Sequence, residues 1–333
     1  MRAIQVRAAG ADFELIEKEI PQPKEREVLI KVEACGICHG DALAKEGGFP
    51  GLSYPRVPGH EVVGTIDKLG SAVSHWKVGQ RVGVGWHGGH CFSCSPCREG
   101  EFGACDNSLT TGLSTDGGYA EYMIARSEAL HGIPEGLSPL DAAPLLCAGG
   151  TTLGALRHSG AKGGDLVAVQ GMGGLGHLAV QFAVKLGCKT VALSRGKQKE
   201  KLARQLGAHA YIDTSAAEAA KELQTMGGAQ VILCTAPGGK GIGELVGGLS
   251  RKGHLVLVSF SREPLQIPSV PLLRGARSIS GWVGGNLEDT IHFSVHAGVK
   301  PMIEVFPLEQ AAAAYNKMMD ATVLFRSVLK MMN

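Results

Sequence analysis

The stretch "DLVAVQGMGGLGHLAVQFAVKLG", residues 165–187, decides the fold of the central part of the chain. An apolar run leads into a glycine-rich turn, and an amphipathic helical pattern follows at once. The residues of this turn are Gly171, Gly173, Gly174, Leu175 and Gly176. Glycines let the backbone approach a pyrophosphate, which would accept hydrogen bonds from the helix amino terminus. Because the strand "KTVALS" (189–194) follows, the pattern predicts a dinucleotide site rather than an ordinary glycine-rich turn.

The end of this second strand predicts which dinucleotide binds. An NAD site usually carries an acidic residue here, about twenty positions after the glycines, to bind the ribose hydroxyls. This chain has Ser194 and Arg195 instead, with Lys199 four residues on. Serine can donate a hydrogen bond to a 2′-phosphate and the two cations can neutralise it, so we expect NADP(H) rather than NAD(H). The alternative is that these are ordinary solvated surface residues.

The pattern of apolar residues differs between the two parts of the chain on either side of Cys147. Beyond Cys147, apolar strands alternate with amphipathic helices up to about residue 281, which predicts a doubly wound parallel sheet. Residues 1–132 instead show short β-runs between Gly- and Pro-rich turns, which predicts a β-rich domain. The last thirty or so residues are expected to form a strand, a helix and a strand that could rejoin the first domain. The segment "GGKGIG" (238–243) lacks the register of a dinucleotide motif and is interpreted as a turn.

Composition limits the function. The 333 residues carry 33 Lys and Arg against 31 Asp and Glu, a formal charge of +2, which is too balanced for a nucleic-acid binder. The amino-terminal "MRAIQVRAAG" lacks the apolar core of a signal peptide, and we find no apolar stretch long enough to cross a bilayer. We therefore expect a cytoplasmic protein with small-molecule partners. In that compartment the nine cysteines are expected to be metal ligands or buried thiols.

One group of cysteines is local. The segment "CFSCSPCREGEFGAC" presents four thiols within fifteen residues: Cys91, Cys94, Cys97 and Cys105. Four thiolates form a closed tetrahedral set for zinc, which leaves no position for substrate, so we expect a structural site. Two disulfides, a cluster of free thiols and an iron–sulfur cluster are the alternatives.

A second possible metal site must be assembled from distant residues. Cys38 lies in "CGICHGD" (35–41), His60 in "PGHEVVG" and Cys147 in "APLLCAGGTT". One imidazole and two thiolates would leave a fourth position open, as in a catalytic zinc site. Spacing alone does not join these residues, since His60 could be a core histidine and Cys147 a small buried hydrophobe.

In this order, "CGICHGD", "PGHEVVG", the four-cysteine loop, "GGYAEY", "LLCAGGTT" and "GMGGLG" resemble the zinc-dependent medium-chain alcohol dehydrogenases, close to the microbial and cinnamyl alcohol dehydrogenase branches. The resemblance covers essentially the whole chain. It implies a GroES-like catalytic domain of residues 1–148 and 282–333 and a Rossmann domain of residues 149–281. It also implies a homodimer or homotetramer and two zinc ions per chain.

The resemblance assigns roles to single residues. Cys38, His60 and Cys147 would hold catalytic zinc, Glu61 and Asp41 would orient the ligands, and Cys35 would be a neighbour only. Further positions match family residues near the cofactor or the substrate. Those near the cofactor are His39, Arg326, Val258, the segment 281–283 and the set Ser194, Arg195 and Lys199, and those lining the substrate pocket are Phe49, Trp86 or His87, and Trp282.

Two positions depart from the family pattern. The family usually has Ser or Thr two residues after the first ligand cysteine and often His three residues later, as a proton relay; this chain has Gly40 and Leu43. A water could fill the space beside Gly40, a bulkier substrate could use it, or the reaction could be reduction of an imine or conjugated bond. The expected function is NADP(H)-dependent alcohol oxidation or aldehyde reduction. Imine or double-bond reduction and an inactive structural or nucleotide-sensing homologue are the alternatives.

Overall fold

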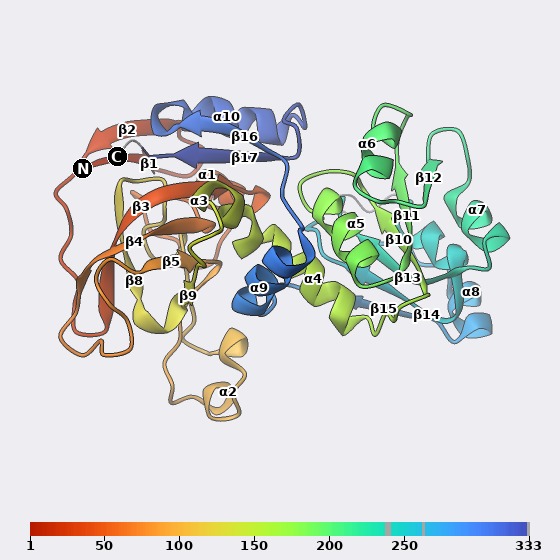
Figure 1. The fold of residues 1–333 in the computed structure, drawn as a ribbon, viewed down its shortest axis with the longest axis horizontal. Helices are drawn as coiled ribbons and strands as arrows, with labels where there is room; N and C mark the ends of the chain where they lie inside the picture. Colours follow the sequence, from red (N-terminus) through yellow and green to blue (C-terminus); the bar gives the residue numbers. More distant parts are fainter. Residues whose placement is uncertain (237–240, 262–263, 332–333) are drawn as a thin grey trace. The chain divides into compact units, whose positions relative to one another are not determined.

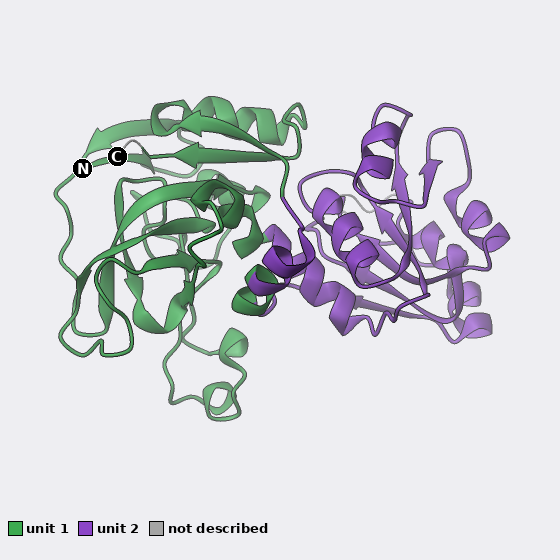
Figure 2. Cartoon of the chain, viewed as in Figure 1, with its two compact units in different colours: residues 1–147, 287–291, 301–333 green, residues 148–286, 292–300 purple. Residues whose placement is uncertain are grey.

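The structure is a computed structural model, which describes residues 1–236, 241–261 and 264–331. It contains two compact units (Figures 1 and 2): unit 1 is residues 1–147, 287–291 and 301–333, and unit 2 is residues 148–286 and 292–300. Unit 2 thus extends beyond the expected boundary at residue 281. The contacts of Trp282 explain this extension, because its ring stacks on His158 at 4.3 Å and its indole N–H donates to the Gly284 carbonyl at 2.9 Å.

Unit 2 is built on a parallel sheet. The strands of this sheet in the described residues follow the order β12-β11-β10-β13-β14-β15 (Figure 1). Their bounds are β10 Leu166–Gln170, β11 Lys189–Ser194, β12 Ala210–Asp213, β13 Ala229–Cys234, β14 Leu249–Leu257 and β15 Ser278–Gly281. From the central pair β10 and β13, the strands β11 and β12 are added on one side, and β14 and β15 on the other. It is the dinucleotide-binding order, in which the ligand lies at the carboxyl ends of the strands beside that switch.

The strands of unit 2 are apolar because both faces of the sheet are covered. All of β10 except Gln170 is buried, and β13 is buried except for Gln230. Right-handed crossovers place the helices before and after the switch on opposite faces. These helices are α5 (Gly176–Lys185), α6 (Glu200–Gln205), α7 (Ala219–Thr225) and α8 (Ser269–Gly275). The predicted doubly wound α/β fold is confirmed for this unit. The turn expected at 238–243 begins in residues outside those that the structure describes.

Unit 1 is built on a mostly antiparallel sheet of order β16-β17-β3-β4-β5-β9, with β8 paired to β3. The bounds are β3 Glu27–Ile37, β4 Val62–Leu69, β5 Arg81–Val84, β8 Tyr122–Arg126, β9 Leu130–Gly132, β16 Ile303–Pro307 and β17 Arg326–Lys330. The eleven-residue β3 pairs with three other strands. Since β17 is one of them, the carboxy-terminal strand, helix (α10, Ala311–Met319) and strand join this unit, as the sequence suggested.

Smaller elements complete unit 1. The amino-terminal segment forms a hairpin of β1 (Arg2–Val6) and β2 (Phe13–Glu17). The short strand β6 (His87–Gly89) pairs with β7 (Leu109–Thr110) at the base of the four-cysteine lobe. This lobe contains the helix α2 (Ser95–Arg98). Short helices α1 (Ala42–Glu46) and α3 (Pro139–Ala142) follow β3 and β9, while α4 (Ala148–His158) and α9 (Leu287–Ala297) lie partly or wholly in unit 2. In the described ranges, no helix has both the length and the apolar character needed to cross a bilayer.

Candidate active site

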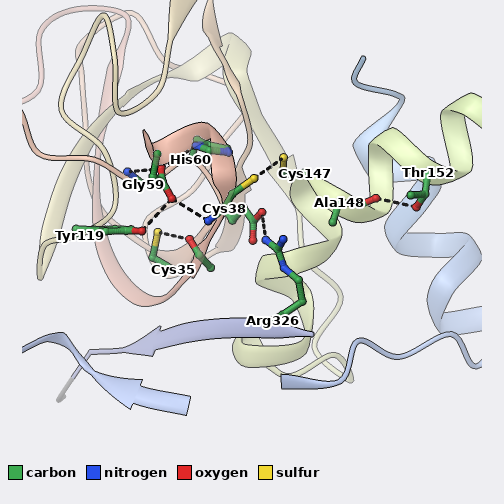
Figure 3. Close-up of polar contacts among 12 residues, drawn as sticks. Cys35, Cys38, Gly59, His60, Tyr119, Cys147, Ala148, Thr152 and Arg326 are labelled. Carbon is green, nitrogen blue, oxygen red and sulfur yellow. Dashed lines mark hydrogen bonds and ion pairs between the residues drawn. The ribbon is translucent and has the colours of Figure 1, made fainter. Parts of the chain in front are cut away.

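The antiparallel pairing of β3 and β4 brings distant residues of unit 1 together. Cys35 on β3 is the register partner of Val62 on β4, so Cys38, just after β3, and His60, just before β4, lie at the same edge of the sheet. Cys147 arrives from the 3-10 helix Ala143–Leu146, whose Leu146 packs with Ala34 and Val63 in the unit 1 core. The thiols of Cys38 and Cys147 point toward one another (Figure 3), and their Sγ atoms are 3.8 Å apart.

These side chains form a set that fits a metal ion. One ligand atom each from Cys38, His60, Glu61 and Cys147 lies within 4.8 Å of all the others. A tetrahedral zinc ion with bonds of about 2.3 Å to sulfur would separate two thiolates by about 3.8 Å. The observed sulfur separation is the same. The buried His60 Nε2 and Glu61 Oε2 have no hydrogen-bond partner. Unpaired buried polar atoms are costly, and a cation held by the cluster would satisfy His60 Nε2.

Asp41 holds His60 in place. Oδ1 of Asp41 lies 3.1 Å from His60 Nδ1 and accepts the Gly59 N–H at 3.2 Å, while Oδ2 accepts the Cys38 N–H and the Tyr119 hydroxyl, each at 2.9 Å. A proton on Nδ1 that donates to Asp41 leaves the lone pair of Nε2 free for a metal. The hydrogen bond from the Cys147 thiol holds the pKa of Cys38 well below its usual value, which favours the thiolate that a metal requires.

Glu61 lies closer to the ligands than the resemblance implied. A carboxylate oxygen of Glu61 belongs to the cluster, and Oε1 of the same carboxylate accepts from the guanidinium of Arg326 on β17. Both side chains are buried, with 0% exposure for Glu61 and 2% for Arg326. Burial raises the pKa of Glu61 to about 7, even though Arg326 opposes the shift. Arg326, expected near cofactor phosphates, is therefore occupied by this ion pair, while His39 is exposed.

The four-cysteine lobe forms a second closed set. The Sγ atoms of Cys91, Cys94, Cys97 and Cys105 all lie within 4.8 Å of one another. Cys105 is 3.6 Å from Cys91 and 3.7 Å from Cys94, much longer than a disulfide bond of about 2.05 Å. Three backbone N–H groups donate to these sulfurs at 3.3 to 3.4 Å. All four of these cysteines are free thiols rather than disulfide-bonded, and their arrangement fits a tetrahedral zinc thiolate site.

The glycine-rich turn of unit 2 is as close-packed as a dinucleotide site requires. A Cβ on Gly176 would lie 1.7 Å from the Gly171 carbonyl oxygen, so no side chain fits where α5 begins. Gly171 has a φ of +97°, and its carbonyl accepts from the Thr235 hydroxyl at 3.0 Å. The turn therefore depends on these two glycines, as the motif predicts.

The residues expected to choose the cofactor gather at the end of β11. Ser194 is half-buried, Arg195 is exposed, and the Lys199 amine donates to the Met172 carbonyl of the glycine-rich turn at 2.8 Å. Asp213 was not predicted as a site residue. It is the register partner of Ser194 on β12, and its carboxylate accepts the Gly196 N–H at 2.8 Å. This bond fixes the backbone just after Arg195. The position of Asp213 at the end of the next predicted strand is the sequence feature that could have pointed to it.

The candidate substrate-pocket residues come from both units. Trp86 packs edge-on against His60, with ring centroids 4.9 Å apart, and Phe49 lies at 6.5 Å from Trp86. His87 points elsewhere, since its Nε2 lies 3.0 Å from His90 Nδ1 in the four-cysteine lobe. Trp282 belongs to unit 2, and so does Val258, which was expected near the cofactor. The backbone N–H of Trp282 donates to the Leu257 carbonyl, and the backbone N–H of Val258 donates to the Cys234 carbonyl. Trp86, rather than His87, thus borders the metal-ligand cluster.

Comparison with known proteins gives matches along the chain. Residues 24–135 match the model of the alcohol dehydrogenase GroES-like domain, and residues 174–296 match that of zinc-binding dehydrogenases. An alcohol dehydrogenase of Penicillium expansum is 44% identical over 97% of this chain and 95% of its own. Vomilenine reductase of Rauvolfia serpentina is 36% identical over 93% and 89%. A sorghum cinnamyl alcohol dehydrogenase structure superposes with a TM-score of 0.89 at 29% identity, covering 99% of this chain and 97% of that one.

Proposed function

Since this chain belongs to the zinc-containing medium-chain alcohol dehydrogenase family, we propose that it transfers hydride reversibly between NADP(H) and an alcohol or aldehyde held beside Cys38, His60 and Cys147. Zinc-dependent alcohol dehydrogenase activity comes with this membership. The preference for NADP(H) and the role of each residue are proposed in addition. The observation that carries the proposal is the cluster of two thiols, one imidazole nitrogen and one carboxylate oxygen within 4.8 Å.

The site residues divide the work. Cys38, His60 and Cys147 would hold zinc, which would supply a Lewis acid for the substrate oxygen while the nicotinamide supplies or accepts hydride. Asp41 keeps His60 in the tautomer that binds a metal. Glu61, which is paired with Arg326, would offer a carboxylate oxygen beside these ligands. Cys91, Cys94, Cys97 and Cys105 would hold a structural zinc that fixes the lobe.

NADP(H) rather than NAD(H) is supported by the charge at the end of β11. Arg195 is exposed beside Ser194, and Lys199 reaches back to the glycine-rich turn. Burial, and to a lesser extent the neighbouring Arg195, lower the pKa of Lys199, so a second cation lies close to this amine. A 2′-phosphate would relieve that repulsion.

A second reaction on the same site is reduction of an imine or an activated double bond. Two observations favour it: residue 40 offers no hydroxyl to carry the proton of an alcohol, and one relative is named as a reductase, vomilenine reductase. An inactive nucleotide-sensing homologue has no support in the site, because every type of ligand is present.

Assembly and location are also proposed. Strand β15 is at the edge of the unit 2 sheet, and the nearby Leu273 and Val283 are 80% and 73% exposed. An unpaired edge with apolar side chains beside it supports pairing with a second copy, in a homodimer or homotetramer. Two thiolate clusters need reduced cysteines, which supports a cytoplasmic location.

The test is a metal assay combined with turnover. We expect two zinc ions per purified chain, and oxidation of NADPH faster than of NADH with aliphatic, aromatic or cinnamyl-type aldehydes. Turnover of imines or conjugated double bonds without turnover of aldehydes would favour the second reaction. Two zinc ions with no turnover of any of these compounds would contradict both.

A further inference from the structure

Two side chains of β12 hold Gly196, the residue that follows Arg195. The Tyr211 hydroxyl donates to the Gly196 carbonyl at 2.6 Å, and Oδ1 of Asp213 accepts the Gly196 N–H at 2.8 Å. Tyr211 and Asp213 are two positions apart on the strand, so their side chains lie on the same face of the sheet. Both backbone polar groups of Gly196 are therefore bound by side chains of one neighbouring strand.

The turn at Gly196 depends on these hydrogen bonds. Its φ is +72°, in the left-handed region that glycine adopts readily, which lets the chain turn sharply after β11. Just before it, the Ser194 carbonyl accepts the Thr214 N–H at 3.0 Å and so continues the pairing of β11 with β12. Because glycine has more conformational freedom than any other residue, the contacts with β12 limit this turn to one conformation.

The Tyr211 hydroxyl contacts both neighbours of Arg195. It donates to Gly196, and a hydrogen bond from the Ser194 side chain opposes the rise in the pKa of Tyr211 that burial causes. Arg195 itself is exposed. An exposed cation binds an anion more tightly when its backbone is already fixed, because less conformational entropy is lost on binding. Tyr211 is thus placed to affect what Arg195 binds without touching the ligand.

Asp213 is arranged as an acceptor for the same turn. Besides the Gly196 N–H, its Oδ1 accepts the Ser215 N–H at 2.9 Å and the Ser215 hydroxyl at 2.6 Å. The bond from the Ser215 side chain is the main cause that lowers the pKa of Asp213. A carboxylate near a phosphate would repel it, but three donors around one oxygen offset part of this charge. The arrangement suits an anchor of the turn better than a ligand of the cofactor.

We propose that Tyr211 and Asp213 are positioning residues that hold the segment 194–196 in the conformation in which Ser194 and Arg195 meet the 2′-phosphate of NADP(H). The cofactor part rests on the proposed function, while the anchoring of the turn does not. On this account the preference for NADP(H) depends on β12 as well as on the residues at the end of β11.

The anchoring is tested by amide hydrogen exchange of the full chain without cofactor. We expect peptides that cover residues 194–199 to exchange faster in Tyr211→Phe than in the parent. The matched control is Thr225→Val, which also removes a hydroxyl that donates to a backbone carbonyl, that of Glu222 at 2.7 Å. Thr225 ends α7 just before β13, at the opposite edge of the sheet, so this variant should leave residues 194–199 unchanged. Equal exchange in the parent and Tyr211→Phe would overturn the anchoring.

The effect on the cofactor is tested by equilibrium binding of NADPH and NADH to the purified chain, followed by nicotinamide fluorescence. We expect Tyr211→Phe to raise the Kd of NADPH by about threefold to tenfold, the range for one lost hydrogen bond, and that of NADH by less than about twofold. In an Arg195→Ala background, the same substitution should change the Kd of NADPH by less than about twofold. Equal effects in both backgrounds, or on both cofactors, would overturn the positioning role.

The part played by Asp213 is tested with Asp213→Ala and the conservative Asp213→Asn. We expect Asp213→Ala to weaken NADPH binding, and Asp213→Asn, which keeps an acceptor at the same place, to restore part of it. NADPH binding in Asp213→Ala as tight as in the parent, or tighter, would overturn this role. A parent that binds NADH as tightly as NADPH would instead refute the proposed cofactor preference, and the exchange experiment would still decide whether β12 anchors the turn.

Discussion

Asp41 Oδ1 lies 3.1 Å from His60 Nδ1, and this contact leaves His60 Nε2 unpartnered within the cluster that contains the Cys38 and Cys147 thiols. The carboxylate also accepts from Cys38, Gly59 and Tyr119, so one buried side chain connects three segments of unit 1. Outer partners of this kind set the tautomer and basicity of metal ligands. Asp41 is thus the link between the fold of unit 1 and its chemistry.

Asp41→Asn should weaken the catalytic zinc. A neutral amide accepts more weakly from His60, and substitutions of such partners typically lower metal affinity by about 10-fold to 100-fold. Competition with a chromophoric chelator measures it, with the zinc of the four-cysteine lobe as an internal control. Tyr119→Phe, which removes one hydrogen bond to the same carboxylate, should have a smaller effect. Equal affinity in the parent and Asp41→Asn would contradict this role.

Cys97→Ser should remove the structural zinc but not the catalytic one. Metal analysis should fall from two zinc ions per chain to one, and the thermal midpoint should drop because a structural metal contributes directly to folding. Cys188→Ser is the matched control, since Cys188 is a buried free thiol outside both clusters. Its zinc content should stay at two. Retention of both ions in Cys97→Ser would disprove the four-thiolate site.

Arg195→Asp should reverse the cofactor preference. The substitution removes a cation and places a carboxylate near the expected 2′-phosphate, so the ratio of kcat/KM for NADPH to that for NADH should fall about 10-fold to 100-fold. Lys197→Asp makes the same change of charge two residues away, also at an exposed position, and should change the ratio much less. A parent that uses both cofactors equally well would refute the assignment.

Glu304 should stabilise unit 1 only above acidic pH. A hydrogen bond from the Leu324 N–H, together with Lys317, lowers the pKa of this carboxyl below its ordinary value of 4.5. A lowered folded-state pKa means that the stabilisation is complete above 4.5 and is lost as the pH falls through the folded value. The difference in thermal midpoint between the parent and Glu304→Gln should therefore be largest near neutral pH and should shrink as the pH is lowered below 4.5. A difference that stays constant across this range would contradict the assignment.

The sequence predicted local features well because their evidence is local. The glycine-rich turn needs only neighbouring residues, and the four cysteines lie within one lobe. Cys38, His60 and Cys147 needed the family resemblance, because the pairing of β3 with β4 that unites the first two cannot be read from their spacing. The contacts of Trp86 with His60 and of Arg326 with Glu61 join residues that are separated in the chain. No local sequence pattern predicts such contacts.

The central claim is that a metal ion lies among Cys38, His60 and Cys147, and anomalous diffraction from crystals of the purified protein at the zinc edge tests it most directly. We predict two peaks per chain. One should lie among the four cysteines of the lobe, and the other about 2.3 Å from both Cys38 Sγ and Cys147 Sγ and about 2.1 Å from His60 Nε2. A single peak, at the four-cysteine lobe alone, in crystals of the active enzyme would contradict the account.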